Sequence, residues 1–320
     1  MTTLIKAKDV FSFDEIRALT ARSNAAGFWA IASTWGIIAL TFLALARWPH
    51  PVTFILAVIV LGGRQLALSI LMHEAAHRSL FAGRVWNDVF TDWLCARPVW
   101  NDVARYRKHH AKHHTHTGTD LDPDRSLADP FPVSRGALAR KFARDLLGIS
   151  GIRRVLGLAL MDLEILEYTV AATVTRRPRG DWRWTDYARA GARNASGMLL
   201  TNLAIAGALA ASGHLWLYWA WVVAYFTTYG LFMRIRSLAE HACTERSPDP
   251  FRNTRTTRAG LLARLTVAPC HVNFHIEHHL LVAVPYYRLP KMHRMLRERR
   301  ALENSEPNYG AVLARVAASF

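Results

Sequence analysis

The sequence predicts an all-α integral membrane protein, with four transmembrane helices in two hairpins and a helical cap on one side of the membrane. Three observations predict this class: long apolar runs, basic residues concentrated outside those runs, and histidine clusters that also lie outside them. Of the 320 residues, 51% are hydrophobic and 20% are charged, with a formal net charge of +16. Apolar and basic residues must therefore be segregated along a single domain, 1–320.

Four apolar runs have the length of membrane spans. They cover residues 28–46, 52–72, 196–212 and 215–235. Each is near the ~20 residues that an α-helix needs to cross about 30 Å of hydrocarbon. The first run has no small-residue cleavage site, so we expect it to be retained as an anchor rather than removed as a signal peptide.

Two further apolar runs carry charges and are not expected to span the membrane. A pair of arginines interrupts residues 146–161, and three acidic residues interrupt 155–175. Charges within an apolar stretch are typical of helices that lie in or under the membrane interface. We expect both runs to be interfacial helices.

Basic residues predict the orientation of the chain. Lys and Arg number 4 in residues 1–27, 20 in 73–194 and 13 in 236–320. The outer turns, 47–51 and 213–214, are short and almost uncharged. The positive-inside rule then places both termini and the cytoplasmic segments 73–194 and 236–320 on the inner side of the cell's inner (plasma) membrane.

The strong basic charge favours a membrane surface over nucleic acid as the partner. It flanks the spans, and the sequence has no nucleic-acid-binding motif. We expect this face to contact anionic lipid of the bilayer and an acidic electron carrier. Arg64 lies inside the second span, where it either faces the bundle interior or extends towards the headgroups.

Histidines form the main functional pattern of the chain. Fifteen are present, and most lie in three clusters. The clusters are His73 and His77; His110, His113 and His114; and His275, His278 and His279. Residues three and four apart share one face of a helix, so each cluster presents its imidazoles in one direction, as a metal-ligand set requires.

The number of histidines predicts two metal ions. All three clusters begin at or follow the cytoplasmic end of a predicted span, and can meet under the same membrane face. Eight nitrogen ligands are too many for one ion. Imidazole suits zinc, copper, iron and nickel, so ligand type alone does not select the metal. The three cysteines have no C-x-x-C spacing and indicate neither a zinc knuckle nor a disulfide framework.

At these clusters the sequence resembles the membrane fatty acid desaturase and hydroxylase superfamily. Its signature is three histidine boxes, H-x(3-4)-H followed by two of the form H-x(2-3)-H-H. Further segments also resemble bacterial members: 119–124, 237–242, 253–257 and 275–290. The resemblance implies a di-iron centre at the cytoplasmic surface, with dioxygen as co-substrate and a hydrophobic tunnel for a fatty acyl chain. It also implies a further histidine ligand just past the last span, a place that His241 occupies.

Several nearby residues leave alternatives open. His109, His116 and His271 adjoin the boxes and are either groups behind the ligands or replacements for them. Carboxylates are possible partners for the outer ring nitrogens of metal-bound imidazoles. These are Asp120, Asp122, Asp124, Glu240 and Glu277; solvated loop charges are an equal alternative for the aspartates.

The first box also fits a different enzyme class. H-E-x-x-H on a helix is the zinc metalloprotease signature, in which Glu74 would be the general base between His73 and His77. That interpretation leaves the two H-x-x-H-H clusters unexplained. A metal transporter would instead place polar groups through the spans, and spans three and four offer little beyond Thr201 and Asn202.

Within the superfamily, the product cannot be read from the histidines. Loss of two hydrogens gives an alkene and insertion of oxygen gives an alcohol, and carotenoid ketolases and hydroxylases have similar third boxes. We expect desaturation of acyl lipids. The chain has no Rossmann glycine motif and no ferredoxin cysteines, so electrons must come from a separate donor, a ferredoxin or small cytochrome with its reductase.

Overall fold

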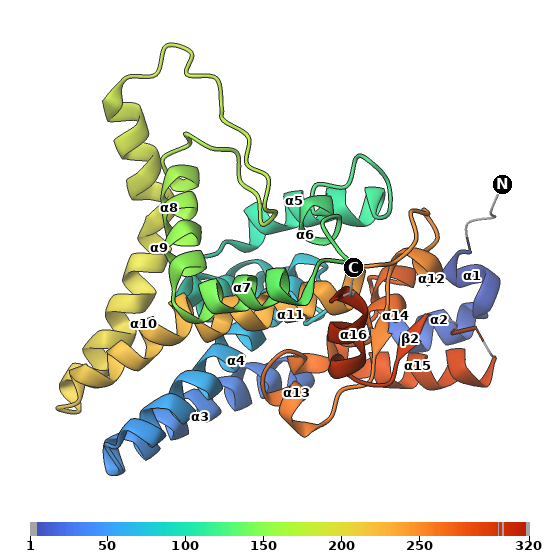
Figure 1. The fold of residues 1–320 in the computed structure, drawn as a ribbon, viewed down its shortest axis with the longest axis horizontal. Helices are drawn as coiled ribbons and strands as arrows, with labels where there is room; N and C mark the ends of the chain where they lie inside the picture. Colours follow the sequence, from blue (N-terminus) through green and yellow to red (C-terminus); the bar gives the residue numbers. More distant parts are fainter. Residues whose placement is uncertain (1–4, 300, 303, 318–320) are drawn as a thin grey trace.

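The computed structural model describes residues 5–299, 301–302 and 304–317 and is almost entirely helical there. Long helices extend to one side, and a cap of shorter helices contains both ends of the described chain (Figure 1). The long helices are α3 (Asn24–Arg47), α4 (Pro51–Ala76) and α9 (Trp184–Ala211), and the shorter helices α10 (Tyr218–Phe226) and α11 (Thr228–His241) pack with them. A short turn, η4 (Leu215–Leu217), precedes α10.

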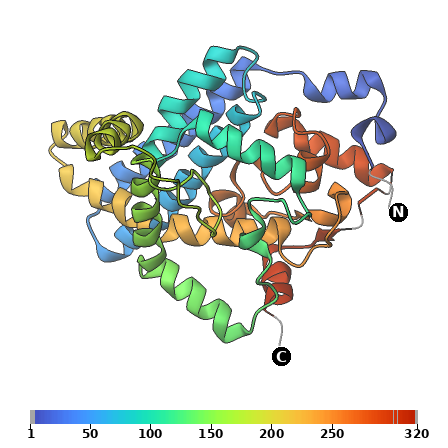
Figure 2. The same cartoon turned by 90° about the horizontal axis from the view of Figure 1, so that it is seen from above.

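Three of these helices are long and apolar enough to cross a membrane: α3, α4 and α9. They contain the predicted spans 28–46 and 52–72, and almost all of 196–212. The chain is therefore a membrane protein of helical type. In α9 the apolar window is only 6% buried, and Figure 2 shows this helix at one edge of the molecule. An apolar helix that contacts so little protein fits a lipid environment.

The predicted fourth span, 215–235, is not one continuous helix. Its segment is divided between η4, α10 and α11, and the chain bends at Thr227, whose φ and ψ are −117° and −90°. The described part of the chain therefore does not confirm four spans or the two-hairpin layout. The bend allows α11 to leave the direction of α10 and bring its last residue, His241, to the cap.

The remaining helices form the cap around the ends of α4 and α11. Its first half contains α1 (Ala7–Val10), α2 (Phe13–Thr20), the π-helical turns η1 (Trp86–Phe90) and η2 (Asp92–Ala96), η3 (Arg97–Val99), α5 (Val103–His116), α6 (Arg125–Ala128), α7 (Arg135–Leu146) and α8 (Ile149–Asp162). Its second half contains α12 (Pro250–Asn253), α13 (Leu261–Leu265), η5 (Pro269–His271), α14 (His275–Leu280), η6 (Tyr286–Arg288), α15 (Leu289–Glu298) and α16 (Tyr309–Val316). Two short parallel strands, β1 (Thr256–Thr257) and β2 (Ser305–Glu306), join its late segments.

The prediction of a second interfacial helix over 155–175 is wrong. Helix α8 ends at Asp162, and the chain continues without a helix to Arg183. Two contacts hold the Asp162 side chain at the helix end: Arg105 Nη1 donates to Asp162 Oδ1 at 2.5 Å, and Trp100 Nε1 donates to Asp162 Oδ2 at 2.8 Å. Glu164 then adopts a positive φ of 58°, which an α-helix does not continue through.

Helix α4 is the central element of the bundle and is buried along most of its length. Arg64, within it, faces the interior, since its Nη2 donates to the backbone oxygen of Leu265 at 2.9 Å. Gly62 allows close approach to α11, because a Cβ added there would lie 2.1 Å from Thr228 Oγ1. The path of α11 towards the cap therefore depends on this contact.

We expect Gly62→Ala to lower the free energy of unfolding by about 1–3 kcal/mol, because the added methyl overpacks the interface of α4 and α11. Gly36→Ala is the matched control, since a Cβ there meets nothing within 4 Å. Thermal unfolding of both variants in the same detergent measures the difference. Equal Tm values for the two would show that the close approach does not hold α11 in place.

Candidate metal centre

Four helices bring the nine predicted histidine ligands to one place. Helix α4 supplies His73, and His77 caps its end. Helix α5 begins where the Asp102 side chain accepts from Arg105 N at 2.8 Å, and it carries the second cluster. His241 is the last residue of α11, and α14 carries the third cluster.

The first group of ring nitrogens comes from all three boxes. Its members each offer a nitrogen within 4.8 Å of the others: His73, His77, His110, His114 and His278. The Nε2 atoms of His110 and His114 are 2.9 Å apart, and those of His114 and His278 are 3.1 Å apart. Both ring nitrogens of His73 and the Nε2 of His77 are buried without a hydrogen-bond partner among the described residues.

The second group lies beside the first. His113, His241 and His279 offer nitrogens within 4.8 Å of one another, as do Glu240, His241 and His275. The Nε2 atoms of His241 and His275 are 2.9 Å apart. The two groups are neighbours, because the ring centroids of His114 and His279 are only 4.2 Å apart.

These distances fit metal coordination. Two nitrogens about 2.1 Å from a shared ion, at right angles to each other, are roughly 3 Å apart. Buried polar atoms are normally hydrogen-bonded, so a set of buried nitrogens without partners indicates a missing ligand. The residues present therefore fit two adjacent metal ions.

The electrostatics of the site favour neutral imidazoles. Burial, followed by the neighbouring histidines, holds the pKa values of His110, His114, His278 and His279 well below the usual value. Burial would also lower the pKa of His113, but the hydrogen bond to Asp122 and nearby carboxylates raise it instead. Neutral rings have the free lone pair that a metal ligand needs.

The five carboxylates near the histidine boxes differ in their partners. Asp122 contacts a ring of the cluster directly, with its Oδ1 2.8 Å from His113 Nδ1. Glu240 Oε1 lies 3.5 Å from His275 Nδ1. Of the other three, Asp124 pairs with His109 at 2.7 Å, and its Oδ2 also lies 3.7 Å from His113 Nδ1. Glu277 pairs with His293 at 2.6 Å, and Asp120 pairs with Arg125 and Arg246.

Three histidines adjacent to the boxes stand outside the groups. His109 turns to Asp124, and neither His116 nor His271 offers a nitrogen to any group among the described residues. His50 and His214 lie at the far ends of α4 and α10, next to the turns between the long helices. The groups thus contain the nine predicted histidines and no other histidine of the described chain.

Glu74 is held by contacts to two other residues of the chain. Its Oε2 accepts from Ser79 Oγ at 3.0 Å and from the backbone nitrogen of Tyr286 at 2.9 Å. It therefore connects the first box to the segment after the third. Sequence patterns missed this role, since nothing links positions 74 and 286 before folding.

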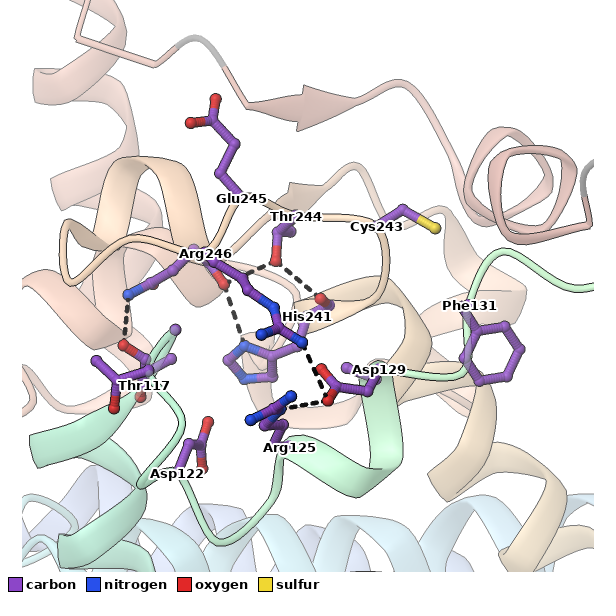
Figure 3. Close-up of a pocket in the computed structure, with 14 residues that line it drawn as sticks. Thr117, Asp122, Arg125, Asp129, Phe131, His241, Cys243, Thr244, Glu245 and Arg246 are labelled. Atoms are coloured by element: carbon purple, nitrogen blue, oxygen red, sulfur yellow. Dashed lines mark hydrogen bonds and ion pairs between the residues drawn. The ribbon is translucent and has the colours of Figure 1, made fainter.

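A pocket of about 170 Å³ reaches the second group from the surface of the cap. Figure 3 shows His241 at this pocket, with Arg125, Asp129 and Arg246 beside it. Arg125 and Arg246 both pair with Asp129, and both are partly exposed. This side of the site is polar and charged.

Fold and site together define a helical membrane protein with a cluster of nine histidines, which could hold metal, at one end of its long helices. Comparison with protein families gives the class more closely. Residues 47–311 match the model of the fatty acid desaturase family, a range that contains all nine histidines. The chain belongs to the fatty acid desaturase family and is an oxidoreductase, which confirms the resemblance seen in the sequence and the prediction of an enzyme.

A curated relative supports this assignment. The dihydrorhizobitoxine desaturase of Bradyrhizobium elkanii is 26% identical over 304 residues, which cover 91% of this chain and 79% of that protein. The name of that protein gives dihydrorhizobitoxine, rather than a fatty acid, as the compound that it desaturates.

Proposed function

We propose that the nine histidines hold two iron ions, and that the enzyme uses dioxygen and external electrons to desaturate fatty acyl chains of lipids. The observation that carries this proposal is the presence of two adjacent groups of ring nitrogens at coordination spacing, several of them buried without a hydrogen-bond partner among the described residues. Family membership supports iron as the metal.

Each ion would have its own ligands. The first would be held by His73, His77, His110, His114 and His278, and the second by His113, His241, His275 and His279. Two irons bound there would supply the activation of dioxygen that attack on an unactivated C–H bond requires. The chain's own contribution is positional: four helices fix the rings, and Asp122 holds His113 by its outer nitrogen.

An apolar groove supports a substrate that comes from the bilayer. It has a volume of about 270 Å³ between α8, α9 and α10, and Val155, Leu199, Trp221 and Phe226 are among its lining residues. Because α9 is an apolar helix of membrane length, the groove is open to lipid tails. Hydroxylation or ketolation of a lipid or carotenoid is the alternative within the same chemistry.

We propose that the cap and both termini are cytoplasmic and that a separate acidic electron donor docks there. The distribution of Lys and Arg supports this orientation. The pocket beside His241 supports an approach from the same side, since Arg125 and Arg246 lie at the surface there. A ferredoxin or small cytochrome with its reductase would supply the electrons.

We expect the protein, made with ample iron and purified, to hold two metal ions per chain. Iron(II) binds more weakly than zinc in the affinity series, so overexpressed protein can carry zinc without being a zinc enzyme. Metal analysis, combined with turnover of iron-loaded and zinc-loaded samples, tests this. One ion per chain, or full turnover with zinc and no iron, contradicts the proposal.

We expect turnover to need both dioxygen and an added electron donor, and the product to have lost two hydrogens. Mass spectrometry of total lipid from a host with and without the gene measures the product. A gain of one oxygen would identify the hydroxylase alternative. Cleavage of peptides without oxygen would refute the oxidoreductase mechanism.

A further inference from the structure

A second cavity, of about 110 Å³, lies against the metal centre between α4, α5 and α11. Four of the proposed ligands form one side of it: His110, His113, His241 and His275. Its volume is comparable with the roughly 150 Å³ cavity that accepts benzene in another protein. It has room for a small group of a bound molecule next to the metals.

Arg236 is one of the two arginines that line this cavity. Its Nε donates to Glu240 Oε1 at 2.7 Å, and the same oxygen is 3.5 Å from His275 Nδ1. One carboxylate therefore separates the guanidinium from a proposed ligand. Its two Nη groups have no hydrogen-bond partner among the described residues, although the side chain is only 17% exposed.

Other donors of the cavity are also free. Tyr106 is more than nine-tenths buried, stacks on His110 at 5.0 Å, and lines the cavity with a hydroxyl that has no partner in the described chain. A phenol is protonated at neutral pH, so the hydroxyl can donate. Asn101 and Ser237 add amide and hydroxyl groups to the same lining.

The acidic groups of the cavity are already engaged. Asp122 contacts His113, Asp124 contacts His109, and Glu240 accepts from Arg236. The groups that remain free to bind a molecule are the two Nη donors of Arg236 and the hydroxyl of Tyr106, close to the histidines. Guanidinium groups bind carboxylates through two parallel hydrogen bonds of this kind, and charge-assisted bonds are the stronger class.

We propose that Arg236, with Tyr106, binds a carboxylate of the substrate, so that the enzyme attacks a free carboxylic acid near its carboxylate end. This inference rests on the proposed function in taking the histidine cluster as the oxidising centre. It replaces the acyl-lipid substrate proposed above with a free carboxylic acid, because an ester-linked chain attacked far from its head group has no anion to place in this cavity. Arg236 is then a binding residue for the substrate.

Binding of small probes to the iron-loaded protein in detergent tests the proposal. Isothermal titration calorimetry compares butanoate with methyl butanoate and butan-1-ol, which have similar chains and no negative charge. We expect butanoate to bind more tightly than either, and Arg236→Gln to weaken it about 10-fold or more while Arg236→Lys loses less. Arg125→Gln is the matched control, an arginine of the same cavity whose partners are Asp120 and Asp129.

Glu240→Gln separates ligand binding from a structural ion pair. If Arg236 serves the ligand, removing the competing carboxylate tightens butanoate binding or leaves it unchanged. If Arg236 only supports Glu240, the two variants weaken binding together, and the proposal fails. Butanoate bound equally by the wild type and Arg236→Gln would show coordination to iron or another site, and would also overturn it.

Failure of the carboxylate site and failure of the metal proposal give different results. Iron content is measured on each sample, so a wild-type protein without two irons refutes the metal proposal whatever the butanoate result. Equal binding of butanoate and methyl butanoate by an iron-replete wild type refutes only the carboxylate site. If Arg236→Gln does not fold, the binding of the three ligands to the wild-type protein still tests the carboxylate site.

Discussion

His110→Ala should lose most of the bound iron and lower turnover by more than about 100-fold, whereas His109→Ala, one residue away, should keep both ions. The side chains point to different partners: His110 Nε2 is 2.9 Å from His114 Nε2 in the first group, and His109 Nε2 is 2.7 Å from Asp124. Loss of a group behind the ligands costs about 10–100-fold in metal affinity or activity, and loss of a ligand costs more.

Metal analysis and turnover of the two variants, purified in parallel, measure the contrast. Circular dichroism shows whether each keeps its helices, which separates ligand loss from unfolding. The sequence left the choice between the two histidines open, because H-x(2)-H-H and H-x(3)-H-H both fit the family pattern. A greater loss of iron in His109→Ala than in His110→Ala would reverse the assignment.

The histidine groups could be anticipated because they depend on local helix geometry. Residues at i, i+3 and i+4 face one way on any helix, so the imidazoles of α5 and α14 were expected to converge within each box. Helix α4 followed from its apolar run, and its end placed His73 and His77 at the cap. Membership of the fatty acid desaturase family confirms the resemblance on which the wider assignment depended.

The bend in the fourth predicted span could not be anticipated. Thr227 lies in a run as apolar as the others, and hydropathy measures composition rather than direction. The bend depends on tertiary contacts: Thr228 Oγ1 donates to Val58 O at 2.7 Å, beside Gly62 of the same neighbouring helix. Only the folded chain brings these positions together.

Partners of the charged groups were also beyond sequence reasoning. Five carboxylates near the boxes looked equivalent, yet Asp122 contacts a proposed ligand while Asp120 pairs with arginines at the surface. Loop geometry decides between them, and loop geometry has no periodic signal. The pair of Arg236 and Glu240 is an exception, since residues four apart share one face of a helix.

His241 lies outside the three boxes, so its assignment as a metal ligand needs its own test. We expect His241→Ala to lose activity and part of the bound iron while the membrane fold stays intact. Its Nε2 is 2.9 Å from His275 Nε2, and its ring centroid is 4.9 Å from that of His113, so its removal opens the second group. The first group, which does not include it, should retain its ion.

His50→Ala is the control, because His50 lies before the first residue of α4, at the end opposite to the histidine groups. It should leave iron content and turnover unchanged. The iron content of His241→Ala should fall from two ions towards one per chain. A fall to none would mean that the two groups bind their ions cooperatively. Full iron content with full turnover in His241→Ala would show that the ligand set closes without it, and that His241 serves only as the neighbour of Asn253, whose backbone oxygen lies 3.4 Å from its Nδ1.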